Sequence, residues 1–339
     1  MENNIQGGVS RRKLLKASIA LMAASGAFFS LPKTLKAQLP QGKLATMIDL
    51  TLCDGCVGKD IPACVSACKT AKNHTIPHPE EPIPVPYPTN IVEDWSKKQD
   101  ISDRLTPYNR IFIQPITLTH SGKETTLYIP RRCMHCDNPA CATLCPFAAN
   151  TKDQTGAVVI DQDLCFGGAK CRSVCPWKIP QRQSGVGLYL KVAKNFMGNG
   201  VMYKCDLCID LLNEGKTPSC IDSCPRKAML IGERNEIYAE AQRRVKAMGG
   251  YIFGKEENGG TATLYVSPIP FNAIDAQIVG KPGIPQLLVG VERKMAKSDG
   301  LAGAILAAPL LGLLAGVFAG VSGRKKSPSV ASEGEKGEE

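Results

Sequence analysis

Residues 133–146 read CMHCDNPACATLCP and separate four cysteines by two, four and three intervening residues. Three other stretches of the chain repeat this arrangement imperfectly. The repeats are Cys53-x2-Cys56-x7-Cys64-x3-Cys68, Cys165-x2-Gly168-x2-Cys171-x3-Cys175 and Cys205-x2-Cys208-x11-Cys220-x3-Cys224. Together the four motifs account for all 15 cysteines, because Gly168 stands where the third motif would have its second cysteine.

The spacing of these cysteines is typical of ligands to iron–sulfur cubanes. A C-x2-C loop wraps thiolates around one face of a cluster, while a cysteine before proline lies on the following helix and reaches a second cluster. The second and third motifs lie close together in sequence, around an expected strand at 157–161, and so form one local unit. The first and fourth motifs are left to pair with each other. We expect an α+β fold of two interleaved ferredoxin-like units with insertions.

Two other classes of protein remain as alternatives. A zinc-binding interaction module also uses C-x2-C pairs, although zinc ribbons rarely add C-x3-C-P to each pair. An enzyme is the other alternative, in which an open iron site at the motif with Gly168 binds a substrate. No acid, base or oxyanion constellation accompanies that motif, so we assign no catalytic residues.

The composition favours a loop-rich globular domain. The 339 residues include 32 Gly and 24 Pro, which excludes a compact helical bundle. Six basic residues against one acidic residue in 1–37 supply +5 of the formal net charge of +10. Thiolates bound to clusters would cancel more of the positive charge. The charge therefore does not indicate nucleic acid as a partner.

Both ends of the chain carry targeting features. Residues 10–16 read SRRKLLK and precede an apolar stretch, which predicts a twin-arginine signal peptide over 1–37. Residues 301–323 contain no charged side chain and are followed by Arg-Lys-Lys, which predicts one transmembrane helix and a cytoplasmic tail at 324–339. We therefore expect the protein at the periplasmic face of the inner (cytoplasmic) membrane, anchored by its C-terminal helix.

The four-motif domain is expected to occupy 38–268, followed by a linker at 269–300. A Pro-rich insertion at 74–110 excludes a regular element there. It predicts either an extended surface segment that a partner covers or a solvated loop.

Two regular elements are expected after the last motif. Asn235 is expected to cap a helix over 236–248, which ends at the following Gly-Gly pair. Alternation of side-chain types predicts a strand at 261–266.

The four motifs resemble those of the four-cluster iron–sulfur subunits of the dimethyl sulfoxide reductase family, over roughly residues 44–230. The likeness rests on CMHC at 133–136, CPWKIPQ at 175–181 and KCDLC at 204–208. Within that family, a separate export signal and a C-terminal membrane helix are most similar to the iron–sulfur subunit of periplasm-facing, membrane-bound nickel–iron hydrogenases. The formate dehydrogenase beta subunit is a near neighbour.

The resemblance implies four sets of metal ligands, which agree with the pairing of the motifs. The first set is Cys53, Cys56, Cys64 and Cys224, and the second set is Cys68, Cys205, Cys208 and Cys220. The third set is Cys133, Cys136, Cys141 and Cys175, and the fourth set is Cys145, Cys165 and Cys171.

Two residues beside the cysteines are also assigned to cofactor binding. Gly168 leaves one corner of the fourth cluster without a thiolate, and family members with tryptophan there carry a three-iron cluster. The resemblance thus implies three [4Fe-4S] clusters and one [3Fe-4S] cluster. His135 lies inside the CMHC loop and is expected to tune the cluster without binding iron.

The resemblance implies an electron-transfer subunit of an oxidoreductase complex, without substrate chemistry of its own. Electrons would pass through four clusters between a periplasmic catalytic subunit, a hydrogenase or a molybdopterin oxidoreductase, and an integral-membrane quinone-reactive subunit. Small residues recur every fourth position of the predicted membrane helix, which favours close docking on the membrane partner. These are Ala304, Ala308, Gly312, Gly316 and Gly320.

Overall fold

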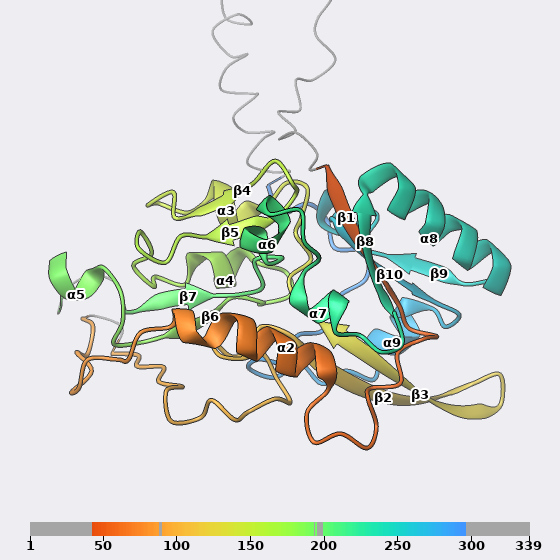
Figure 1. The fold of residues 1–339 in the computed structure, drawn as a ribbon, viewed down its shortest axis with the longest axis horizontal. Coiled ribbons are helices and arrows are strands. Elements are labelled where there is room, and N and C mark those ends of the chain that lie inside the picture. The colour runs from red at the N-terminus through yellow and green to blue at the C-terminus, as the bar shows by residue number, and fades with distance from the viewer. Residues whose placement is uncertain (1–42, 88–89, 193, 195–198, 296–339) are drawn as a thin grey trace, which may run out of the picture. The chain divides into compact units, whose positions relative to one another are not determined.

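The computed structural model describes residues 43–87, 90–192, 194 and 199–295 (Figure 1). The predicted signal peptide at 1–37, the predicted transmembrane helix at 301–323 and the tail at 324–339 lie outside these residues. Within the described ranges, no helix combines the length and the apolar character needed to cross a bilayer.

The described part of the chain is a mixed α+β structure with short elements, as predicted. The strands are β1 (Leu44–Asp49), β2 (Phe112–His120), β3 (Lys123–Arg131), β4 (Asn150–Lys152), β5 (Val158–Ile160), β6 (Gln181–Gln183), β7 (Val201–Tyr203), β8 (Met229–Glu233), β9 (Tyr251–Phe253) and β10 (Thr263–Ser267). The helices are α2 (Ala63–Lys72), α3 (Ala140–Thr143), α4 (Lys170–Val174), α5 (Tyr189–Val192), α6 (Ile209–Asn213), α7 (Ser219–Asp222), α8 (Arg234–Met248) and α9 (Phe271–Asp275). Two 3-10 turns are η1 (Asn73–Thr75) and η2 (Glu257–Gly259). The strands predicted at 157–161 and 261–266 are present as β5 and β10.

The largest sheet has the strand order β8-β1-β10-β9, and the other strands form the two-stranded sheets β2-β3, β4-β5 and β6-β7. β1 pairs parallel to β10 and antiparallel to β8. α8 lies along the four-stranded sheet (Figure 1) and buries Ile237 and Ala241 against Met47 and Leu264. This contact explains the apolar face that the sequence places on α8.

The helix predicted over 236–248 is present, but its predicted start is wrong. β8 runs directly into α8, so Glu233 is the N-cap residue and makes no capping bond with its side chain. Asn235 therefore lies inside the first turn and does not cap the helix. The end is as predicted, because Gly249 adopts φ 64°, a conformation that favours glycine.

Two pairs of short helices hold the cysteine motifs. α2 of the first motif packs on α7 of the fourth, and α3 of the second motif packs on α4 of the third. The β4-β5 hairpin connects α3 to α4, and α3 packs on β4. This arrangement agrees with the predicted pairing of the first motif with the fourth and of the second with the third.

The segment that follows β10 contributes to the core as far as Leu287. α9 lies in this segment, and its apolar side chains join the largest buried cluster. The indole Nε1 of Trp177, two residues after the third motif, donates a hydrogen bond to the carbonyl oxygen of Leu287 at 2.7 Å. Trp177 is 2% exposed, so this bond ties the motif to the later chain inside the core.

Trp177→Phe is expected to lower the free energy of unfolding by about 1–3 kcal/mol, because it leaves the buried Leu287 carbonyl without its donor. For a domain of this size, the thermal midpoint should fall by several degrees. Circular dichroism of the anaerobic protein measures this midpoint. Tyr87→Phe, at a side chain that is 69% exposed, is the control and should leave the midpoint unchanged. Equal midpoints for the two variants would contradict the role of the Trp177 bond.

Candidate iron–sulfur sites

The structure gathers three of the four expected ligand sets around three separate cavities. One cavity is lined by Cys53, Cys56, Cys64 and Cys224. Another is lined by Cys133, Cys136, Cys141 and Cys175. The last is lined by Cys145, Cys165 and Cys171 together with Gly168. These are the first, third and fourth sets, each brought together from two distant motifs or from both sides of a hairpin.

The second set is recognised by burial and by the mutual influence of its thiols. Its four members are Cys68, Cys205, Cys208 and Cys220, and all are buried. Burial raises the pKa of Cys68 well above its ordinary value, and repulsion from the other three cysteines raises it further. Such repulsion requires short distances between the sulfur atoms.

Helix geometry explains how one motif serves two clusters. Cys64 and Cys68 are four residues apart on α2, so they lie on the same face about one turn apart. The first belongs to the first set and the second to the second set. The C-x3-C end of the first motif therefore places one cysteine in each of two neighbouring sets.

The four sets form a linear series. Burial and repulsion from Cys220 raise the pKa of Cys64. Because this repulsion acts over short distances, the first set lies next to the second. Burial raises the pKa of Cys205, and Cys133 of the third set adds to this effect. Burial and repulsion from Cys141 raise the pKa of Cys171 to about 12, which joins the third set to the fourth.

Tight loops aim backbone N–H groups at the first cysteine of three motifs. The N–H groups of Gly167 and Leu207 each donate to the cysteine two residues earlier, Cys165 and Cys205, at 3.4 Å. In the first motif, an N–H group of Gly55 likewise lowers the pKa of Cys53, although burial dominates and raises that pKa to about 11. Gly55 has φ +68°, and a Cβ there would lie 2.3 Å from the ring of Tyr128, so only glycine fits.

The loop of the fourth set keeps this geometry even though it lacks one cysteine. Gly168 lines the cavity, and a Cβ added to it would meet no atom within 4 Å. The empty volume at this site, which includes space open to solvent, is about 530 Å³, against about 320 Å³ at each of the other two. The position of the missing ligand is therefore open.

His135 is fully buried in the loop of the third set. Burial, and then the cations Lys204 and Arg132, lower its pKa well below the ordinary value, so the ring is neutral. Its Nδ1 accepts a hydrogen bond from the N–H of Val158 at 2.9 Å, which places the proton on Nε2. That Nε2 has no hydrogen-bond partner among the described residues, so one buried donor is left beside the third set.

The donor sets fit iron–sulfur clusters. Burial raises the pKa of Cys175 and Cys220 to about 12, so these thiols would stay protonated without a cation to hold the thiolate. Iron would supply that charge, because metal binding deprotonates its cysteine ligands. The N–H groups aimed at sulfur stabilise the same thiolate form.

Two buried cations between the second and third sets were not anticipated. Arg132 directly precedes Cys133 of the third set, but its Nη1 lies 4.0 Å from the Sγ of Cys205 in the second set. Lys204 directly precedes Cys205; burial lowers its pKa, but the attraction of Cys133 in the third set and of other acidic groups outweighs this and raises the pKa. Each cation thus interacts with a cysteine of the other set, not only with the set that it directly precedes in the sequence. The only signal in the sequence is a basic residue directly before the C-x2-C loops of motifs two and four.

Two protein-family models match the chain, and both are described as a 4Fe-4S dicluster domain. They cover residues 52–149 and 124–234, and together they span all four cysteine motifs. The Hydrogenase-2 operon protein HybA of Escherichia coli O157:H7 is 29% identical over 304 residues, covering 79% of this chain and 83% of that protein.

Other relatives belong to different complexes. One component of the anaerobic dimethyl sulfoxide reductase of Escherichia coli (strain K12) is 37% identical over 110 residues, which is 32% of this chain and 47% of that protein. One component of the sulfite dehydrogenase of Allochromatium vinosum is 28% identical over 216 residues, which is 62% of this chain and 76% of that protein.

The gathered cysteines and the matching models define an iron–sulfur protein of the ferredoxin type. The chain matches the family that the resemblance indicated, iron–sulfur subunits with 4Fe-4S dicluster domains, and its function is electron transfer.

Proposed function

We propose that this chain carries electrons through three [4Fe-4S] clusters and one [3Fe-4S] cluster, held by the four cysteine sets in the order first, second, third, fourth. The observation that carries the proposal is the packing of α2 on α7 and of α3 on α4, together with the electrostatic influence of thiols in one set on those of the next: Cys220 on Cys64, Cys133 on Cys205 and Cys141 on Cys171. Clusters in such a series pass electrons from one end of the domain to the other. The third set would be assisted by His135 and the fourth would be completed around Gly168.

The partners follow from the chemistry of the relatives. A periplasmic catalytic subunit, a hydrogenase or a molybdopterin oxidoreductase, supplies or receives electrons at one end of the series. An integral-membrane quinone-reactive subunit stands at the other end. Support comes from relatives whose names place them with a hydrogenase, a dimethyl sulfoxide reductase and a sulfite dehydrogenase.

Deletion of the chain tests this role directly. Membranes without it should still oxidise the donor, hydrogen or formate, with an artificial dye, since the catalytic subunit is intact. Reduction of a quinone by the same donor should be lost, because the electron path to the membrane is broken. Quinone reduction at the wild-type rate with both donors would contradict the role.

The two alternative functions, an enzyme and a zinc-binding module, predict different properties for the isolated chain. An enzyme with an open iron site at Gly168 would turn over substrate as an isolated chain, whereas an electron-transfer subunit needs its catalytic partner. A zinc module needs ligands that converge on one ion. Among the described residues, no group of three or more His, Cys, Asp or Glu is placed to hold a single metal ion.

Export of the folded domain is part of the proposal. The paired arginines in residues 1–37 would route a cluster-loaded protein to the periplasmic face, where the helix at 301–323 anchors it. Arg11→Lys combined with Arg12→Lys should reduce the exported, cluster-loaded protein by about tenfold or more. Immunodetection and iron analysis of cell fractions measure the change. Unchanged export would mean that residues 1–37 are not the signal or that a partner carries the chain.

A further inference from the structure

Residues 90–96 of the Pro-rich insertion, which we call the strap, are hydrogen-bonded to Gln183 and Ser184, which follow the third motif in the chain. The N–H of Glu93 donates to the Oγ of Ser184 at 2.9 Å, and the N–H of Ser184 donates to the carbonyl oxygen of Glu93 at 2.8 Å. The N–H of Trp95 donates to the Oε1 of Gln183 at 2.9 Å. The sequence predicted for this insertion either an extended surface segment that a partner covers or a solvated loop.

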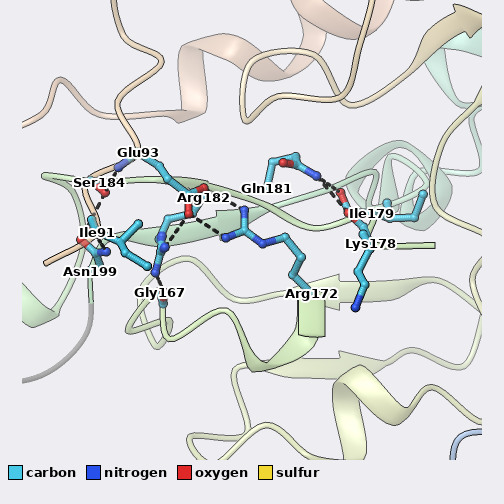
Figure 2. A network of polar contacts seen from close by, with 10 residues as sticks. All are labelled: Ile91, Glu93, Gly167, Arg172, Lys178, Ile179, Gln181, Arg182, Ser184 and Asn199. Carbon is cyan, nitrogen blue, oxygen red and sulfur yellow. Dashed lines mark hydrogen bonds and ion pairs between the residues drawn. The ribbon is translucent and has the colours of Figure 1, made fainter. Parts of the chain in front are cut away.

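The carboxylate of Glu93 stands between Arg172 of the third motif and Arg182 of β6 (Figure 2). Arg172 donates to both carboxylate oxygens, with Nη1–Oε2 at 2.8 Å and Nη2–Oε1 at 2.6 Å. Arg182 donates from Nη2 to the same Oε1 at 2.5 Å. The two-pronged bond to Arg172 fixes direction as well as distance.

Both arginines adjoin the loop that carries the fourth set of cysteines. Arg172 directly follows Cys171, and Nη1 of Arg182 donates to the carbonyl oxygen of Gly167 at 2.9 Å. Gly167 precedes Gly168, in the loop that lacks a cysteine ligand. Arg182 is 6% exposed, so its bond to this loop is shielded from water. A loop with one ligand fewer has one covalent restraint fewer, and the bond from Arg182 provides another restraint at that point.

We infer that Glu93 is a positioning residue for the fourth cluster, which holds the loop 165–171 through Arg182 and Arg172. The inference rests on the proposed function and deepens it, because it assigns a role to the insertion. Glu93 also balances one of two positive charges beside this cluster. Its loss adds one unit of net positive charge beside the cluster, which favours the reduced cluster and raises the potential.

The test compares Glu93→Gln with Asp94→Asn in the full chain, purified anaerobically. Asp94 is the next residue of the strap and binds Gln183 instead of the arginines, so Asp94→Asn removes an equal charge without releasing the loop. In Glu93→Gln, the electron paramagnetic resonance signal of the fourth cluster should decay at least about tenfold faster in the presence of an iron chelator. The signals of the other clusters should decay as in the wild type.

A redox titration separates positioning from general stability. In Glu93→Gln the midpoint potential of the fourth cluster should rise, while Asp94→Asn should keep the wild-type value. The double variant Glu93→Gln with Arg172→Gln restores the charge balance and should return the potential, yet the rapid loss of iron should persist. If Glu93→Gln does not accumulate, Arg182→Lys gives the same test of the loop, since it keeps the charge but not the forked geometry.

The outcomes distinguish the inference from the proposed function. Iron–sulfur signals in the wild type, with equal decay rates in Glu93→Gln and Asp94→Asn, would overturn the inference alone. A wild-type protein without iron–sulfur signals would overturn the proposed function itself.

Discussion

Gly168→Cys is expected to add about one iron atom per chain and to abolish the resonance signal of an oxidised three-iron cluster. The structure leaves room for this side chain, because a Cβ at Gly168 meets no atom within 4 Å and its φ is not in the left-handed region. The new thiolate would face the cavity that already holds Cys145, Cys165 and Cys171. A fourth thiolate adds negative charge, so the midpoint potential of this cluster should fall.

Gly168→Ala is the matched control for this conversion. It places a methyl group in the same space but supplies no ligand, so it should keep the three-iron signal at about one spin per chain. Iron analysis and low-temperature resonance spectra of the air-oxidised proteins measure both effects. A wild-type protein that holds about 16 iron atoms and shows no three-iron signal would mean that a ligand other than cysteine completes a cubane.

Arg132→Met is expected to lower the midpoint potential of the second cluster by about 60 mV or more, which is a tenfold change in the one-electron equilibrium. Nη1 of Arg132 lies 4.0 Å from the Sγ of Cys205. At this distance a full charge contributes about 4 kcal/mol at an effective dielectric constant of 20, so a tenfold effect is conservative. The positive charge favours the extra electron, and its removal therefore lowers the potential.

Arg131→Met is the control, because Arg131 is also buried but belongs to a different network. Its guanidinium donates to the Oε1 of Gln114 at 2.7 Å and to the carbonyl oxygen of Gln286 at 3.0 Å. Neighbouring residues at a strand end point to opposite faces, which explains the separation. A redox titration followed by resonance spectroscopy should show the shift in Arg132→Met only. Equal shifts in both variants would contradict a local effect of Arg132 on the second cluster.

The cysteine spacing predicted much of this site because ligand spacing is a local property. Cys64 and Cys68 are one helical turn apart, so the sequence alone indicates that they reach neighbouring sites. Spacing also indicated that motif one meets motif four, and the structure brings α2 onto α7. The strand at 261–266 was predictable for the same reason, since alternation of side chains is local.

Long-range contacts of charged side chains could not be predicted in this way. Glu93 lies 79 and 89 residues from its two arginines, and only the folded chain brings them together. Arg132 stands next to one cysteine set but contacts the other, which depends on how the two units pack. The start of α8 differed because β8 continues directly into the helix, leaving no loop residue where Asn235 could cap it.

The most direct test of the central claim is the content of iron, acid-labile sulfide and zinc in the anaerobically purified chain. Three four-iron clusters and one three-iron cluster predict about 15 iron and about 16 sulfide per chain, with no stoichiometric zinc. All 15 cysteines would be used as ligands. Stoichiometric zinc without labile sulfide would contradict the account, because the same cysteines would then form structural zinc sites and carry no electrons.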